Sequence, residues 1–355
     1  MNSKVRVSVL AVVTTLALPA LSAGPVFNFT LGSGIANGDQ VYNGFTQAAS
    51  RWSSIFTDNV TINVTIGFVS LAPTVLGSTS LTMGTVLDSS FKAALGMDAK
   101  SADDATAVAH LQPSGSNEFI INHTNECNNC TSVYLSNGSK YDNLHETVSL
   151  AEARALGLYS STNSVSDGSI SFNSDFAFDF DPSNGITAGS YDFVGVATHE
   201  IGHLLGFFST VDDYDICGST LNCITSRPNS AISENEDAPS VLDLFRYSTG
   251  SAFGTVMDQS ADTRAKYFSI DGGLTMGPLF ATGKNFGDGR QASHWKDNLG
   301  LGILDPTAAQ GELLGISQND IRALDVIGWD VVPEPGSVGL LAAGLAMLAF
   351  RRRRC

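Results

Sequence analysis

The sequence predicts an α+β fold, with a mixed, twisted sheet and helices in one two-lobed domain over residues 24–331. Segments with strand-like alternation and segments with helical spacing of apolar residues are interspersed along this stretch. Neither a Pro-rich linker nor an internal repeat divides it, so we expect a single domain. The upper lobe should span about residues 24–206 and the lower lobe about 207–331.

The first half of the domain contains one clear strand and four helical patterns. Apolar residues of the segment NVTINVTIGFV share one face, as in a half-buried strand: Val60, Ile62, Val64 and Ile66. Helical spacing of apolar residues occurs in four segments: 44–56, 89–98, 101–110 and 149–157. The polar, Asn-rich stretch 112–143 is predicted to be a loop.

A second strand is predicted over residues 170–181, where phenylalanines and aspartates alternate. One face carries Phe176, Phe178 and Phe180. The other face carries Asp175, Asp179 and Asp181. The pattern favours the interpretation that these carboxylates lie on the solvated face of an exposed edge strand. The alternative interpretation is that they bind calcium.

A capped helix is predicted near the end of the domain, in SQNDIRALDVIGWD. Ser317 should be its N-cap and Asp320 its third residue, which is the pattern of a capping box. Gly328 should lie just past the end of this C-terminal helix.

The first residues of the chain are predicted to direct export. Residues 1–23 combine Lys4 and Arg6 with an apolar stretch and a small-residue exit, which is the layout of a secretory signal peptide. We therefore expect a signal peptidase to remove them.

The C-terminal tail, residues 332–355, has three parts: a Val-Pro-Glu-Pro turn, a hydrophobic stretch over 336–350 and the cluster Arg351–Arg354. The hydrophobic stretch is a predicted transmembrane helix, although it spans only about 22 Å. The tail resembles the PEP-CTERM sorting signal of Gram-negative bacteria. That resemblance implies export across the inner membrane, transient membrane association, and processing by an exosortase-type enzyme. The processed protein would reach the cell surface or the extracellular matrix.

The charge balance excludes one class of partner. The chain has 35 acidic and 19 basic residues, a net charge of −16 and a pI near 4.6. Binding to nucleic acid requires a basic surface, so we expect no nucleic-acid partner. Six of the basic residues and one acidic residue lie in the two terminal segments, which leaves 13 basic and 34 acidic residues and a net charge of −21.

Four cysteines lie in the domain as two close pairs, Cys127 with Cys130 and Cys217 with Cys223. In an exported protein, such pairs predict two small loops closed by disulfides. Two alternatives involve zinc. All four thiolates can form one zinc site, or a cysteine of the first pair can ligate zinc in a latent form.

Residues 191–208, YDFVGVATHEIGHLLGFF, carry the motif that predicts chemistry. His199 and His203 lie four residues apart on one helix face, so both imidazoles can reach one metal ion. Glu200 stands where a base for a metal-activated water is needed. Asp192 is a candidate N-cap, and the opposite helix face is apolar.

A catalytic zinc site needs a third protein ligand. The helix should break at Gly206, and Ser209, three residues later, is a poor ligand. Three other histidines are expected at the surface: His110, His123 and His145. The remaining candidates are His294 and four acidic residues: Asp212, Asp213, Glu234 and Glu236.

The stretch after residue 290 resembles the leishmanolysin-type metzincins, in which a long insertion separates HExxHxxG from a third His followed by Trp. The pair His294-Trp295 matches that feature, Ile303–Pro306 matches the turn under the metal, and Asp325–Trp329 matches the end of the terminal helix. Leu304 stands where these enzymes carry a Met. Since that Met packs and does not coordinate, we expect Leu304 to pack there as well.

The predicted function is therefore that of a secreted zinc endopeptidase with a zincin-like fold. The resemblance implies three zinc ligands: His199, His203 and His294. Glu200 should take a proton from water and deliver it to the leaving amine. The strand over 170–181 is the expected edge for an extended peptide substrate, and Tyr247 and Tyr267 are candidate oxyanion partners by chemistry alone. The alternative is a non-catalytic matrix protein that binds polysaccharide or calcium.

Overall fold

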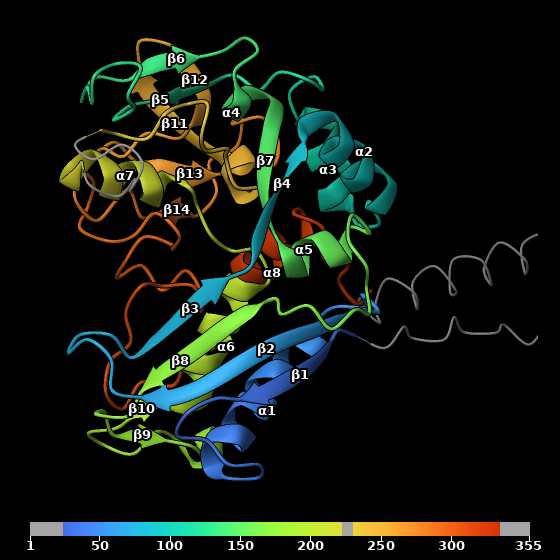
Figure 1. The fold of residues 1–355 in the computed structure, drawn as a ribbon, viewed down its shortest axis with the longest axis vertical. Coiled ribbons are helices and arrows are strands. Elements are labelled where there is room, and N and C mark those ends of the chain that lie inside the picture. The colour runs from blue at the N-terminus through green and yellow to red at the C-terminus, as the bar shows by residue number, and fades with distance from the viewer. Residues whose placement is uncertain (1–23, 222–229, 334–355) are drawn as a thin grey trace, which may run out of the picture.

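Two large β-sheets, two small two-stranded sheets and packed helices make up the described part of the fold, and they confirm the predicted α+β class. The computed structural model describes residues 24–221 and 230–333. Figure 1 shows a four-stranded sheet beside helices α1 (Gln40–Ser53) and α6 (Phe193–Leu204), and a second sheet at the other end of the molecule. Helix α6 packs on α1 and on the four-stranded sheet, so the predicted active-site helix lies in the core.

The four-stranded sheet has the order β1-β2-β8-β3. Its strands are β1 (Val26–Leu31), β2 (Thr61–Val69), β3 (Gly77–Leu81) and β8 (Gly168–Asn173). Strands β1, β2 and β8 run parallel, and β3 runs antiparallel to β8 at the edge of the sheet. The predicted alternation around β2 is confirmed, because four residues of one face are buried: Val60, Ile62, Val64 and Ile66.

The strand predicted over residues 170–181 is wrong in its extent and in its position. Strand β8 ends at Asn173, whose Oδ1 accepts hydrogen bonds from the backbone of Leu71 and Asp175 and so starts a turn. The chain then forms the short strand β9 (Phe178–Asp179), which pairs with β10 (Tyr191–Asp192). Because β8 lies between β2 and β3, it has no free edge, and the edge strands of this sheet are β1 and β3.

The second sheet has the order β14-β13-β11-β12-β5-β6. Its strands are β5 (Phe119–Ile121), β6 (Tyr134–Ser136), β11 (Arg246–Ser251), β12 (Gly254–Asp258), β13 (Lys266–Phe268) and β14 (Leu279–Phe280). The loop predicted over 112–143 is therefore wrong, since it contains β5 and β6. Strand β5 is completely buried and pairs with β12, so this sheet combines chain from both sides of residue 206.

The predicted helices are confirmed, with shifts of a few residues at their ends. Helix α1 begins earlier than expected because the Asp39 side chain accepts a hydrogen bond from the Tyr42 backbone N–H. Helix α8 has the predicted capping box of Ser317 and Asp320, and Gly328 follows it at φ 120°. In addition to α1 and α6, the confirmed helices are α2 (Asp88–Asp98), α3 (Ala102–His110), α5 (Leu150–Ala155) and α8 (Gln318–Asp325).

The remaining elements are short or had no counterpart in the sequence pattern. They are β4 (Met83–Leu87), α4 (Tyr141–Leu144), β7 (His145–Ser149), α7 (Val211–Thr220) and two 3-10 turns at Pro182–Asn184 and Leu242–Phe245. None of the helices within residues 24–221 and 230–333 is long and apolar enough to cross a membrane.

Cys127 and Cys130 form the predicted disulfide. Both sulfurs are therefore consumed, which excludes the four-thiolate zinc site and zinc ligation by this pair. Cys217 is disulfide-bonded as well, and its predicted partner Cys223 lies outside the described residues. The predicted signal peptide and the tail from residue 334, with its hydrophobic stretch, also lie outside them.

Candidate metal centre

Helix α6 is held by its own N-cap and by two side chains from distant segments. The Asp192 carboxylate caps it by accepting from the Gly195 N–H at 2.8 Å, as predicted. Two buried indoles donate to its backbone carbonyls: Trp52 to Thr198 at 2.9 Å and Trp329 to Leu205 at 2.7 Å. The helix thus has little freedom to move relative to the core.

The structure brings His199, His203 and His294 together. The Nε2 atom of His203 lies 3.0 Å from that of His199 and 3.2 Å from that of His294. Within the described part of the chain, these three form the only group of three or more His, Cys, Asp or Glu side chains whose ligand atoms all lie within 4.8 Å of one another.

The opposite nitrogen of each imidazole faces a backbone carbonyl. His199 Nδ1 lies 2.7 Å from the Ile303 oxygen, and His203 Nδ1 lies 2.7 Å from the Phe207 oxygen. His294 Nδ1 lies 3.3 Å from the Gln291 oxygen. Because a carbonyl oxygen only accepts, each Nδ1 must carry the proton, and each neutral ring then has its lone pair on Nε2.

Three nitrogen lone pairs therefore point at one another, and no hydrogen bond between them is possible. A divalent cation resolves this arrangement, because neutral imidazole nitrogens are metal ligands. Tetrahedral ligands held about 2.0–2.1 Å from zinc are about 3.3 Å apart. The two Nε2 separations from His203, 3.0 and 3.2 Å, are close to that value, so these residues fit a three-histidine zinc site.

Burial keeps these histidines neutral at physiological pH. It lowers the pKa of His199 and of His203 from 6.5 to about 4. Burial also lowers the pKa of His294, and the neighbouring histidines lower it further. Metal binding requires unprotonated imidazoles, so the three rings are ready to bind without losing protons.

Glu200 lies beside the histidines on the same helix and is 6 % exposed. Its Oε2 accepts a hydrogen bond from the Thr79 hydroxyl on β3 at 2.6 Å. A Cβ added at Gly77, also on β3, would lie 2.7 Å from Glu200 Oε1, so the glycine makes room for the carboxylate. Burial raises the pKa of Glu200, while the electrostatic interaction with the His203 ring and the Thr79 hydrogen bond lower it in part.

The turn that follows His294 in the chain forms the floor of the site. Leu304 is fully buried, and a Cβ added at Gly202 of α6 would lie 3.1 Å from both of its methyl carbons. Its backbone oxygen accepts from the Trp295 N–H at 2.9 Å. Leu304 thus packs beneath the helix between the two histidines of the motif, as expected for a residue at that position.

The acidic candidates for a third ligand are not part of this group. Both oxygens of Asp212 accept hydrogen bonds from residues 292–293. Glu234 is fully buried and accepts from the side chains of Tyr134, Ser136 and Lys140. The Ser209 hydroxyl donates to Asp243, in agreement with its exclusion as a ligand.

The three aspartates considered as a calcium site accept hydrogen bonds from neighbouring residues. Asp179 accepts from Thr187 and from the Asp181 backbone, and Asp181 accepts from Ser183. Asp175 accepts from Ser70. Asp175 and Asp181 are exposed and Asp179 is half-buried, on a segment that is a turn and a two-residue strand and not one continuous edge strand.

The two candidate tyrosines lie in the six-stranded sheet. The Tyr267 hydroxyl donates to the Gly273 oxygen at 2.8 Å. Tyr247 lines a cavity of about 340 Å³ with His110 and Phe253. These contacts do not connect either hydroxyl to the three histidines.

One of the three histidines expected at the surface is buried. His123 is only 2 % exposed, because its ring stacks on Phe286 at 3.7 Å. His110 is exposed as predicted, and His145 is half-buried against Tyr141.

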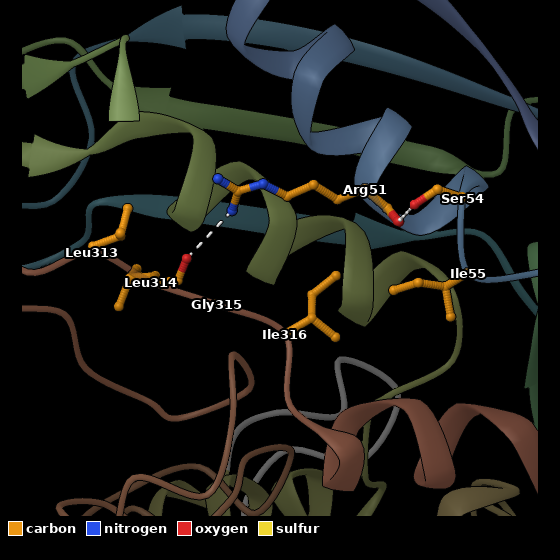
Figure 2. Close-up of a pocket in the computed structure, with 7 residues that line it drawn as sticks. All are labelled: Arg51, Ser54, Ile55, Leu313, Leu314, Gly315 and Ile316. Atoms are coloured by element: carbon orange, nitrogen blue, oxygen red, sulfur yellow. Dashed lines mark hydrogen bonds between the residues drawn. The ribbon is translucent and has the colours of Figure 1, made fainter. Parts of the chain in front are cut away.

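A larger cavity, of about 470 Å³, lies between the end of α1 and the segment before α8. Figure 2 shows Arg51 extending from α1 toward the Leu314 carbonyl, with Ile55 and Ile316 on the same cavity. None of the three histidines lines it, so it is separate from the candidate metal centre.

Several residues that shape the site could not be identified from the sequence. The carbonyls of Phe207 and Ile303 orient two histidines, yet any residue supplies a carbonyl. Thr79 lies in the Gly/Ser-rich strand β3, which has no hydrophobic alternation to reveal it. Asp320 was identifiable as a capping residue, but its contacts with residues 302–304 depend on the tertiary fold.

Comparison with known proteins identifies the tail of the chain. No curated protein and no solved structure matches the sequence. Residues 331–354 match the PEP-CTERM protein-sorting motif. The chain therefore carries a PEP-CTERM sorting tail, which indicates export and exosortase-type processing in a Gram-negative bacterium.

Proposed function

We propose that this protein is an exported, zinc-dependent endopeptidase with His199, His203 and His294 as the zinc ligands. The observation that carries the proposal is the convergence of three Nε2 lone pairs beside a buried glutamate. Three protein ligands with one open position are typical of catalytic zinc sites, whereas structural sites use four. When bound, zinc polarises a substrate carbonyl and lowers the pKa of water.

Glu200 is the proposed general base. Its buried carboxylate has a raised pKa, which brings it closer to the operating pH and makes it a better proton acceptor. The Thr79 hydroxyl holds one of its oxygens, Oε2, and leaves Oε1 facing Gly77. Glu200 would take a proton from the attacking water and transfer it to the nitrogen of the leaving amine.

Strand β3 is the proposed substrate edge, in place of the segment 170–181. It is one of the two edge strands of its sheet, and its Thr79 contacts the general base directly. An extended peptide can therefore pair with β3 through backbone hydrogen bonds and bring its scissile bond next to Glu200.

The test compares the purified protein with Glu200→Gln and His294→Ala, using Glu236→Ala as the matched control. We expect Glu200→Gln to keep zinc and lose peptide cleavage by about 100-fold or more. His294→Ala should lose zinc, and Glu236→Ala should keep both. Equal cleavage by wild type and Glu200→Gln would refute the enzyme proposal and favour the non-catalytic matrix protein. Zinc loss in Glu236→Ala alone would refute the ligand set.

A further inference from the structure

The third histidine differs from the other two in how it is held. His199 and His203 are residues of helix α6, but His294 lies on a segment without regular secondary structure. Its contact with the Gln291 carbonyl, at 3.3 Å, is also the longest of the three that orient the rings. The position of His294 therefore depends on what fixes the chain on either side of it.

A buried carboxylate fixes the chain just before His294. Asp212, in the first turn of α7, is 8 % exposed. Its Oδ1 accepts from the Ala292 N–H at 2.6 Å, and its Oδ2 accepts from the Ser293 N–H at 3.0 Å and from the Ser293 hydroxyl at 2.6 Å. Three donors from two consecutive residues thus converge on one side chain.

A second buried carboxylate fixes the chain just after His294. Asp320 of α8 is fully buried, and its Oδ1 accepts from the Trp295 indole at 2.8 Å. Its Oδ2 accepts from the Ile303 N–H at 2.8 Å. A Cβ added at Gly302 would lie only 2.2 Å from this carboxylate, so the turn packs directly on it.

The contacts of Asp320 reach two ligands. Trp295 is the direct neighbour of His294 in the chain, and the Ile303 carbonyl is the partner of His199 Nδ1. The Asp212 carboxylate, by contrast, accepts hydrogen bonds from Ala292 and Ser293, in the segment before His294. In the described part of the chain, the hydrogen bonds of these two carboxylates do not include one to a histidine ring.

We propose that Asp212 and Asp320 are positioning residues that hold His294 at the metal centre and thereby set its metal affinity. This inference rests on the proposed zinc site. Groups that orient metal ligands typically change affinity by about 10–100-fold when they are replaced. An Asn in place of either Asp presents an NH₂ group to a backbone N–H, so at least one of these hydrogen bonds is lost.

The experiment measures zinc affinity by competition with a chelator for wild type, Asp212→Asn and Asp320→Asn. Asp325→Asn is the matched control, because Asp325 is a buried carboxylate of the same helix that bonds to Ser101. We expect about 10–100-fold weaker zinc binding in the first two variants and less than about twofold change in the control. Ser293→Ala, which removes one hydrogen bond to Asp212, is a milder second variant with a smaller loss.

A second arm repeats the measurement in a His294→Ala background, at zinc concentrations high enough to load the weaker site that His199 and His203 still form. If Asp212 acts through His294, Asp212→Asn should have no further effect there, whereas Asp320→Asn should keep a smaller effect through His199. In the metal-free protein, amide hydrogen exchange at residues 292–293 should rise in Asp212→Asn and stay unchanged in the Asp325 control.

The outcomes separate this inference from the proposed function. A wild-type protein that binds no zinc refutes both. A wild type that loses zinc on His294→Ala, while Asp212→Asn and Asp320→Asn bind it as tightly as wild type, refutes only the positioning role. An equal loss from Asp212→Asn with and without His294 also refutes it, because the effect would then be a general one on stability.

Discussion

The packing between Gly202 and Leu304 predicts that Gly202→Ala destabilises the wild-type protein but stabilises a variant that lacks the Leu304 side chain. Gly202 lies inside helix α6, where replacing Gly by Ala normally stabilises by about 0.5–1 kcal/mol. Here the new Cβ would lie 3.1 Å from Cδ1 and Cδ2 of Leu304 and 3.5 Å from Trp52 Cζ2. Both methyl carbons are closer than ordinary van der Waals contact, and Leu304 has no free space to move into because it is fully buried.

We therefore expect Gly202→Ala to destabilise the wild-type background by about 1–2 kcal/mol, since overpacking outweighs the helix propensity. Leu304→Ala alone should cost about 3–5 kcal/mol, as for other fully buried leucines. In the Leu304→Ala background, the Cβ at position 202 instead enters the new cavity. Gly202→Ala should then stabilise by about 0.5–1 kcal/mol or more.

Equilibrium urea unfolding of the four proteins in the metal-free state measures this cycle. The expected coupling between the two positions is about 2 kcal/mol. If Gly202→Ala has the same effect in both backgrounds, Leu304 does not pack beneath α6. The floor of the site would then be described incorrectly.

Three further predictions concern pH, charge and metal. His199 and His203 have a pKa of about 4 in the folded protein and 6.5 as the ordinary value, so the unfolded chain takes up protons first as the pH falls. The free energy of unfolding of the metal-free protein should therefore fall by about 2 kcal/mol per histidine between pH 7 and pH 5. Urea unfolding of His203→Gln should show a correspondingly smaller fall. An equal fall in wild type and His203→Gln would contradict the lowered pKa of His203. Asp167→Asn should lower the free energy of unfolding by about 3–5 kcal/mol in the same assay. The Arg154 guanidinium is fully buried and lies 2.7 Å from the Asp167 carboxylate, so the substitution removes its countercharge. A decrease below about 1 kcal/mol would contradict that pairing. Zinc at about 100 times its dissociation constant should stabilise the wild type by about 2.7 kcal/mol and should not stabilise His203→Ala to the same extent.

The sequence predicted those parts of the fold that depend on local periodicity. Helix α6 and its cap at Asp192 follow from apolar spacing and side-chain capping, and strand β2 follows from alternation. The histidines of the motif had to meet because residues four apart share a helix face. His294 was identified through a resemblance, and its convergence with the motif is the strongest agreement between sequence and structure.

The errors concern features that tertiary pairing decides. Strand β5 is only three residues long and becomes a strand by pairing with β12, which lies far along the chain. The end of β8 at Asn173 depends on a side-chain amide that competes for backbone donors. Asp212 was considered as a ligand, and its actual contacts with residues 292–293 cannot be read from spacing.

The central claim is that three Nε2 lone pairs hold one zinc ion, and a crystal structure of the zinc-loaded protein tests it most directly. Anomalous scattering at the zinc edge should show one peak about 2.0–2.1 Å from the Nε2 atoms of His199, His203 and His294. A peak coordinated by other side chains, or no peak between the three imidazoles at saturating zinc, would contradict the claim.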